Sequence, residues 1–318
     1  MKKYLLVCLL LFNAALANAT QNPQVQQFIH HMSNRYHFDK RYLNQLFSHI
    51  VIKPPVINTS TGKPLEVMTW VKYRSAYFTP TRIQAGVAFW KNYQSTLQAA
   101  EKEYGVPAYV IVGILGAETN YGKTQGSDPV LNTLANLSFN GNRRENYFRS
   151  ELTNYLLLCR EYGFDPLSIN GSYAGAMGAP QFMPSAYRKY AVDFRGNGKA
   201  DLMQDPQDII VSTANFLRKN GWRPGVPVAI PVEVLNPARL PRVSFKPIYT
   251  KAELSRFGIK PLGPLDNHTR YRFIILQGDN GPEYWLGTQN FYTITRYNPS
   301  TFYAMIVYQL GQAAKKGI

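Results

Sequence analysis

The chain has 318 residues, of which 45% are apolar and 14% aromatic, and its formal net charge is +16 at pH 7. This length supports one sizeable hydrophobic core with room for a second small unit. So large a positive charge indicates an anionic partner or surface. A generally solvated basic surface is an equally good interpretation of the charge alone.

The first nineteen residues have the pattern of a secretory signal. Lys2 and Lys3 precede an apolar run over residues 4–12, which is too short to span a bilayer, and the segment ends in the small-x-small motif Ala17-Asn18-Ala19. An N-terminal anchor helix is the alternative, and the short run argues against it. We therefore expect export to the periplasm with cleavage after Ala19. Association of the mature protein with the membrane or wall stays open.

Of the two cysteines, only one is left after that cleavage, so the mature protein cannot form an intramolecular disulfide. Cys8 lies inside the apolar run with Val7 before it, which does not fit a lipidation motif, and it leaves with the signal. Cys159 lies in an apolar stretch and is predicted to be a buried thiol.

Export argues against nucleic acid as the anionic partner. Peptidoglycan carries lactyl and peptide carboxylates and lies where the signal sends the protein, so its glycan strands are the expected partner.

The predicted fold class is α+β, predominantly α. Residues 20–225 are expected to be a helical region, because apolar residues recur at helical spacing over residues 25–32, 43–50 and 83–97. Residues 226–288 are expected to form a small β-rich unit, inserted before a C-terminal helix. Residues 289–318 are expected to return to the helical region.

The β-rich unit is predicted from three segments. Residues 226–234 alternate as a strand does, and their prolines favour a sheet edge. Residues 271–277 and 283–286 predict two more strands around the turn Asp279-Asn280-Gly281. The C-terminal helix is predicted from Ser300 to about Gln312.

Glu118 is the candidate catalytic residue. It ends a predicted helix that starts near Pro107 and stops near Gly122, and it shares one helix face with Val110 and Ile114. Desolvation on an apolar face and the negative helix C-terminus both raise the pKa of a carboxyl group. A general acid for glycoside cleavage needs such a pKa. On this helix alone, a solvated and idle Glu is the more common outcome.

Two glycine-containing segments strengthen the prediction that Glu118 is catalytic. Gly113 and Gly116 weaken the predicted helix, and they thin it where another backbone or a sugar chain could approach. In residues 172–184, small residues let backbone groups line a groove, and Ser172 and Gln181 could form hydrogen bonds to a sugar. An ordinary Gly-rich turn is the alternative for the second segment.

Together these segments resemble the lytic transglycosylase B family of bacterial murein hydrolases. The resemblance runs from about Phe28 to Gln312. The motifs that carry it, in chain order, are Gly116-Ala117-Glu118-Thr119-Asn120-Tyr121-Gly122, Ser172-Tyr173-Ala174-Gly175-Ala176-Met177-Gly178, Gln181-Phe182-Met183-Pro184-Ser185, Ala214-Asn215-Phe216-Leu217, Gly221-Trp222, Thr295-Arg296-Tyr297-Asn298 and Tyr303-Ala304-Met305.

The resemblance implies a lysozyme-like helical catalytic core and cleavage of the β-1,4 bond between N-acetylmuramic acid and N-acetylglucosamine. Glu118 matches the catalytic glutamate of the family. The positions that match groove residues near the cut are Ser172, Gln181, Tyr297 and Asn298. The positions that match residues holding sugars or stem peptides are Tyr73, Arg143, Arg144, Tyr147 and Tyr303. The two arginines suit carboxylates as charge-assisted donors, and a solvated basic pair is their alternative.

The sequence departs from the family pattern at two places. Phe216 stands where the family often has Tyr, so a hydroxyl is lost and a stacking face for substrate is kept. Residues 193–205 resemble the EF-hand-like calcium loop of the family, with Asp193, Asn197, Asp201 and Asp205 as candidate ligands.

Two other residues of this loop weaken the calcium prediction. Arg195 brings a positive charge to a ligand position, and Gln204 replaces the final carboxylate. A metal-free turn is the alternative to a structural calcium ion.

The expected mechanism uses Glu118 as the single acid/base, forms 1,6-anhydromuramic acid ends and requires no cofactor. Two alternatives remain: a hydrolytic muramidase with the same acid, and a non-catalytic peptidoglycan-binding scaffold. We expect a monomer, with proteins of cell-wall synthesis or division as further partners.

Overall fold

The computed structural model describes residues 19–53 and 68–318 of the chain. The predicted signal lies outside the described residues except for Ala19. This residue is buried, and its amide donates to the carbonyl of Ile50 at 3.0 Å. Within the described ranges, no helix has both the length and the apolar character needed to cross a bilayer.

Helices dominate the described ranges. In chain order they are α1 (Pro23–Tyr36), α2 (Lys40–Ser48), α3 (Trp70–Tyr77), α4 (Pro80–Asn92), α5 (Gln94–Tyr104), α6 (Ala108–Thr119), α7 (Val130–Phe139), α8 (Glu145–Tyr162), α9 (Pro184–Tyr190), α10 (Pro206–Lys219), α11 (Lys251–Arg256), α12 (Gln289–Tyr297) and α13 (Thr301–Lys316).

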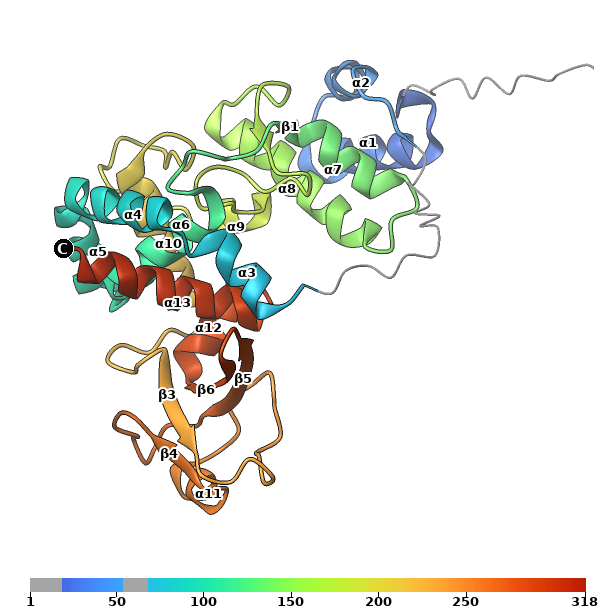
Figure 1. Cartoon of the computed structure of the whole chain (residues 1–318). Coiled ribbons are helices and arrows are strands. Elements are labelled where there is room, and N and C mark those ends of the chain that lie inside the picture. The colour runs from blue at the N-terminus through green and yellow to red at the C-terminus, as the bar shows by residue number, and fades with distance from the viewer. Residues whose placement is uncertain (1–18, 54–67) are drawn as a thin grey trace, which may run out of the picture.

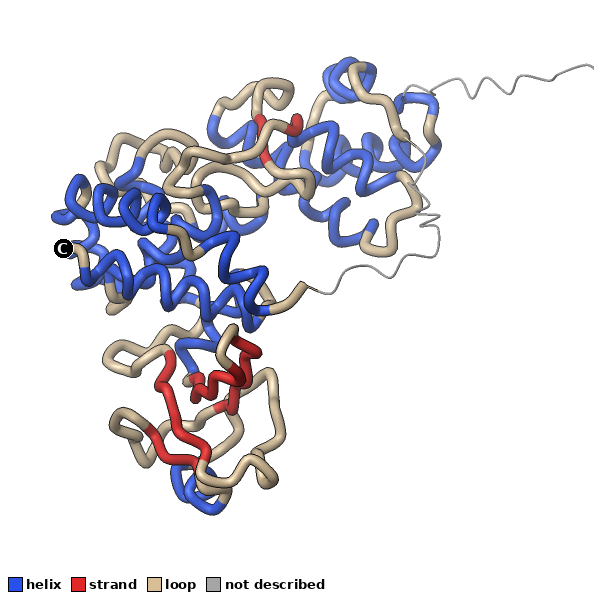
Figure 2. Tube along the Cα trace, viewed as in Figure 1, coloured by secondary structure: helices blue, strands red, loops and turns tan. Residues whose placement is uncertain are grey.

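Strands make two sheets of different size. Their bounds are β1 (Asp128–Pro129), β2 (Asn170–Gly171), β3 (Ala229–Val234), β4 (Ile259–Pro261), β5 (Arg272–Gly278) and β6 (Gly281–Gly287). The first two form a short antiparallel pair, and the other four form one antiparallel sheet in the order β4-β3-β6-β5. Figure 2 shows the four-stranded sheet in a unit of its own below the helices.

The helices gather in two groups that share one hydrophobic core. Helices α1, α2, α7 and α8 lie together at one end, while α6 packs against α13 in the other group (Figure 1). Helix α13, the last of the chain, lies between α6 and the sheet unit (Figure 1). This path brings the C-terminal part of the sequence against the helix that carries Glu118.

The predicted helices lie where they were expected along the chain, but their bounds differ from the prediction. The apolar stripe over residues 83–97 spans two helices, α4 and α5, because the backbone of Tyr93 (φ −121°, ψ 26°) leaves the helical region. The amide of Tyr93 still donates to the carbonyl of Phe89, which closes α4. Periodic apolar spacing does not reveal such a break, since the apolar spacing continues across it. The predicted burial of Cys159 is confirmed.

The predicted turn at Asp279-Asn280 is confirmed, because Gly278 pairs with Gly281 at the end of the β5–β6 hairpin. The expectation that the proline-containing strand lies at a sheet edge is wrong, since β3 lies between β4 and β6. It tolerates Pro231 because it changes partners there. Residues 229–231 pair with β6, and residues 232–234 pair with β4.

The sheet unit has a small hydrophobic cluster of its own. The buried members of the cluster are Ile230, Val232, Leu254, Ile259, Tyr271, Phe273 and Leu286. Its strands run from residue 229 to residue 287.

Candidate active site

Glu118 lies in the last turn of α6, which is buried along almost its whole length. The two glycines of this helix serve helix packing. Gly113 lies against the backbone carbonyl of Val307 in α13, where a Cβ atom would clash, and Gly116 lies against Tyr121 and Leu310. The close approach expected at these glycines is therefore that of another helix and a tyrosine ring, and it fixes Glu118 relative to α13.

The end of α6 is strained directly after Glu118. Asn120 (φ 49°) and Tyr121 (φ 61°) both have left-handed backbone conformations, and the amide of Tyr121 donates to the carbonyl of Leu115 at 3.0 Å. Gly122 was expected to end the helix, but Asn120 is its C-cap. Left-handed non-glycine residues cost about 1 kcal/mol or more each and cluster at functional sites.

Thr119 ties this strained end to the Gly-rich loop of residues 172–184. Its hydroxyl donates to the carbonyl of Ala179 at 2.8 Å and accepts from the amide of Gly122 at 2.9 Å. The side chain is fully buried. Sequence reasoning missed this role, although a Thr next to a candidate acid was the available signal. The bond holds the loop next to the carboxyl group of Glu118.

Tyr303 of α13 forms the principal contact of the Glu118 carboxyl group. Its hydroxyl donates to Oε1 of Glu118 at 2.6 Å, and Tyr303 is only 3% exposed. Burial raises the pKa of Glu118 to about 7, and the hydrogen bond from Tyr303 lowers it in part. Among the described residues, no other ionised group contributes to this shift. Near neutral pH, the carboxyl group of Glu118 is therefore protonated in some molecules and ionised in others.

Aromatic rings surround this pair. The ring of Tyr297 lies parallel to that of Tyr303, with centroids 6.4 Å apart, and its hydroxyl donates to the carbonyl of Pro180. Phe216 packs edge-on against Tyr297 with centroids 4.7 Å apart and is 8% exposed. Phe216 therefore packs against Tyr297 inside the protein, and the expected stacking face for substrate is covered by protein. Sequence reasoning could not show this burial.

The Gly-rich loop contributes Ser172 and Gln181, both partly exposed. The hydroxyl oxygen of Ser172 accepts from the amide of Ala176 at 3.0 Å, while no described residue accepts its proton. The side-chain amide nitrogen of Gln181 donates to the carbonyls of Gly178 and Gln125. Its carbonyl oxygen has no protein partner among the described residues. One donor and one acceptor are therefore left for a ligand.

Tyr73 comes from α3 and lies half-buried between two aromatic rings. Its ring centroid is 4.9 Å from that of Tyr77 and 5.8 Å from that of Phe302. Burial first, then Tyr77 and the negative charge of Glu118, raise the pKa of Tyr73. The influence of Glu118 means that the hydroxyl of Tyr73 lies within electrostatic reach of the candidate acid.

The remaining predicted substrate residues are exposed. Arg144 lies over the ring of Tyr147 at 4.2 Å, at the start of α8, and Arg143 precedes it. Asn298 caps the end of α12 through its backbone, and its side chain has no partner among the described residues. Exposed donors of this kind are accessible to a ligand.

Several side-chain oxygens of the EF-hand-like loop accept hydrogen bonds from the protein. Both carboxylate oxygens of Asp193 accept backbone amides, one from Gly196 and one from Gly198. Asp205 does not turn into the loop, because it caps α10 and forms an ion pair with Arg195 at 3.2 Å. Across residues 19–53 and 68–318, no three acidic, histidine or cysteine side chains are grouped as a metal site would require. Asp205 as a calcium ligand stays a prediction, and in this structure its carboxylate is held by α10 and Arg195.

Asp208 organises this loop and was missed by sequence reasoning. It is 1% exposed, and its two oxygens accept the amides of Phe194 and Asp201. Asp201 in turn accepts the amides of Met203 and Gln204. The available signal in the sequence was an acidic residue three positions after the loop. The loop is closed by protein hydrogen bonds.

Comparisons with known proteins agree with this geometry. Residues 20–312 match the family described as "Transglycosylase SLT domain". The chain is 44% identical over 301 residues to "Membrane-bound lytic murein transglycosylase B" of Escherichia coli (strain K12), which covers 92% of this chain and 82% of that protein. The chain belongs to this transglycosylase family. It is therefore an enzyme, a lytic murein transglycosylase.

Two solved structures extend the comparison. The Escherichia coli lytic transglycosylase Slt35 in complex with calcium is 43% identical with a TM-score of 0.85, and it covers 93% of each chain. Pseudomonas aeruginosa SltB3 in complex with NAG-anhNAM-pentapeptide is 28% identical with a TM-score of 0.77, and it covers 92% of this chain and 79% of that one. The predicted family and the predominantly helical, lysozyme-like fold are confirmed.

Proposed function

We propose that Glu118 is the single acid and base of a reaction that cleaves the β-1,4 bond between N-acetylmuramic acid and N-acetylglucosamine. The observation that carries this proposal is the burial of Glu118, which raises its pKa to about 7, together with the hydrogen bond from Tyr303. A group with this pKa can both give and take a proton at neutral pH.

In the first half of the reaction, protonated Glu118 gives its proton to the glycosidic oxygen, and the bond to the anomeric carbon of muramic acid breaks. N-acetylglucosamine leaves with a free 4-hydroxyl. The acetamido oxygen of the substrate, or a stabilised oxocarbenium ion, replaces the second carboxylate that most glycosidases use. Ser172, whose hydroxyl proton is free, and Asn298 orient the acetamido group.

In the second half, the carboxylate of Glu118 takes the proton of the 6-hydroxyl of muramic acid. The 6-oxygen then bonds to the anomeric carbon and closes the 1,6-anhydro ring. Glu118 regains its proton, and no water is consumed. The related SltB3 has been solved both with NAG-NAM-pentapeptide and with NAG-anhNAM-pentapeptide, and the second contains the anhydro sugar that this reaction would form.

The surrounding groups supply binding. Gln181 offers an amide oxygen, Tyr73 and Tyr297 offer aromatic surface, and Arg143 and Arg144 offer donors for lactyl or peptide carboxylates. A chain with a formal charge of +16 also attracts an anionic polymer over distance. We extend the proposal to location and partners: an exported periplasmic monomer that acts on glycan strands, alongside proteins of wall synthesis or division.

Calcium enters no step of this proposal. The related Slt35 has been solved with calcium, but in this chain Arg195 brings a positive charge into the loop and holds Asp205. The oxygens of Asp193 also accept two backbone amides. This donor set is a poor fit to a calcium ion, which needs several free carboxylate or carbonyl oxygens.

Digestion of purified sacculi tests the proposal. Glu118→Gln keeps the size of the side chain and removes the acid, so the rate should fall by about a thousandfold or more. The matched control is Glu103→Gln, an exposed carboxylate on α5, which should digest normally. Mass spectrometry should find products lighter by one water than hydrolytic products. Products with reducing ends, or an active Glu118→Gln variant, would contradict the proposal.

A further inference from the structure

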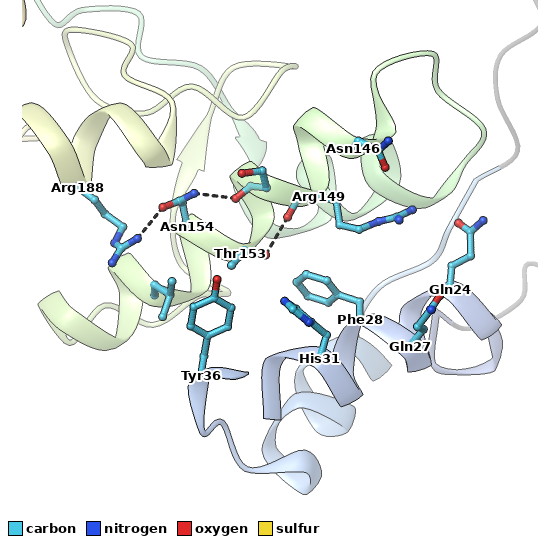
Figure 3. A pocket seen from close by; sticks show the side chains of 12 residues that line it. Gln24, Gln27, Phe28, His31, Tyr36, Asn146, Arg149, Thr153, Asn154 and Arg188 are labelled. Atoms are coloured by element: carbon cyan, nitrogen blue, oxygen red, sulfur yellow. Dashed lines mark hydrogen bonds between the residues drawn. The ribbon is translucent and has the colours of Figure 1, made fainter. Parts of the chain in front are cut away.

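A ligand-sized pocket lies away from Glu118, between α1 and α8. Its volume is about 580 Å³, and its walls come from α1, from α8 and from Arg188 of α9. Figure 3 shows the side chains of Phe28, His31 and Tyr36 projecting from α1 towards α8. Binding sites for small ligands commonly have volumes of roughly 300–1,000 Å³. We name it the α1–α8 pocket.

The pocket uses a different face of α8 from the predicted substrate groove. Asn146, Arg149 and Thr153, spaced by three and four residues, line the pocket. Tyr147 and Glu151 lie on another stripe, and Glu151 accepts from the amide and hydroxyl of Ser185, at 2.9 and 2.7 Å, next to the Gly-rich loop. The pocket is therefore separate from the site of Glu118.

Two arginines, Arg149 and Arg188, line the pocket, and no carboxylate does among the described residues. Arg188 is fixed by Glu161, at 2.6 and 2.9 Å, and donates to the side-chain oxygen of Asn154. Arg149 donates to the carbonyl of Ser138 at 3.1 Å and lies 3.8 Å from a carboxylate oxygen of Glu145, while its buried Nε atom has no partner among the described residues. Preorganised guanidinium groups of this kind favour a carboxylate-bearing ligand.

The rest of the lining suits a sugar. The side-chain amides of Gln24, Gln27 and Asn146 have no hydrogen-bond partner within residues 19–53 and 68–318, so they can donate to and accept from hydroxyl and acetamido groups. The rings of His31 and Tyr36 meet edge-on at 5.8 Å and offer an aromatic wall. Free amides beside aromatic surface bind both the polar rim and the apolar face of a pyranose ring.

We propose that the α1–α8 pocket is a second binding site for an N-acetylated amino sugar that carries a carboxylate. This rests on the proposed function, since that chemistry is found in the wall glycan. The ligand comes either from a neighbouring glycan strand or from a released muropeptide. A second contact on the same polymer raises the effective concentration of substrate at the catalytic groove.

The test uses the full mature chain in the inactive Glu118→Gln background and measures binding to insoluble sacculi. Asn146→Asp places a negative charge in the pocket, and its position in the first turn of α8 favours an acidic residue, so folding is preserved. The matched control is Gln98→Glu, an exposed residue on α5. We expect Asn146→Asp to weaken sacculus binding by about tenfold and the control to leave it unchanged.

Uncharged double variants test whether the lost amide contacts, and not only an added negative charge, weaken binding to sacculi. Gln27→Ala combined with Asn146→Ala removes two free amides, and Gln94→Ala combined with Gln98→Ala is its control on α5. The pocket pair should weaken binding several-fold, while the unfolding temperatures of both pairs stay within a few degrees of the parent. Unchanged sacculus binding in both Asn146→Asp and the neutral pair overturns the proposal.

A second arm identifies the source of the ligand. Titration with a soluble disaccharide-peptide should shift NMR signals of His31 and Tyr36 if released muropeptide binds. If only sacculi respond to the variants, the ligand is a glycan strand. Activity of the Glu118-intact variants on short soluble strands, which should match the parent, tests the catalytic proposal separately. Loss of sacculus binding with normal soluble activity supports the second site alone.

Discussion

Tyr303→Phe removes one oxygen atom and with it the 2.6 Å hydrogen bond to Oε1 of Glu118. This bond stabilises the charged carboxylate and lowers the pKa of Glu118 from the value that burial alone would give. Hydrogen bonds to charged groups contribute about 1.5–3 kcal/mol, and one pKa unit corresponds to about 1.4 kcal/mol. The substitution should therefore raise the pKa of Glu118 by about one to two units.

The sign of the effect on activity follows from the first proton transfer. The reaction starts from protonated Glu118, so the rate falls as pH rises through its pKa, which is about 7 in the parent. A higher pKa moves this fall to higher pH, and the variant should keep more of its maximal rate under mildly alkaline conditions. The assay is the pH dependence of kcat/KM on soluble glycan strands.

Tyr308→Phe on the same helix is the matched control. The hydroxyl of Tyr308 has no hydrogen-bond partner among the described residues, and its ring packs on Tyr109 and Trp285. The pH at which kcat/KM falls should be the same for this variant as for the parent. If Tyr303→Phe leaves the fall in place or moves it to lower pH, then Tyr303 does not stabilise the carboxylate of Glu118 and the reasoning fails.

Three further predictions concern packing, metal and processing. Gly113→Ala should destabilise the fold by about 1–3 kcal/mol in a denaturant titration, because the added Cβ meets the backbone carbonyl of Val307; an unchanged midpoint would contradict the close helix crossing. Calcium or a chelator should leave the unfolding temperature and the digestion rate unchanged, since Arg195 places a positive charge in the loop and pairs with Asp205. A rise of several degrees in the unfolding temperature on addition of calcium would refute this. N-terminal sequencing of the exported protein should begin at Thr20, and a mature chain that keeps residues before Ala19 would contradict the predicted signal.

The sequence was sufficient for elements set by local chemistry. The apolar run of α6 predicted a buried helix, and it placed Glu118 at the end of an apolar face. The Asp279-Asn280 turn predicted the β5–β6 hairpin, because a two-residue turn fixes its own register. The motifs identified the family because they follow one another in a fixed order along the chain.

Contacts between distant segments were decided only by the tertiary structure. Glu118 and Tyr303 are 185 residues apart, and no period or turn in the sequence reports that α13 returns to lie on α6. The same path buries Phe216 against Tyr297. Which face of α8 meets α1 is likewise a matter of packing, and that packing creates the α1–α8 pocket.

Glu118 illustrates the division most clearly. The sequence determined that a carboxyl group ends an apolar helix, and desolvation follows from that position. The depth of burial and the hydrogen-bond donor set the pKa near neutrality, and both depend on side chains from other elements. Local sequence therefore selected the acid, and long-range packing tuned it.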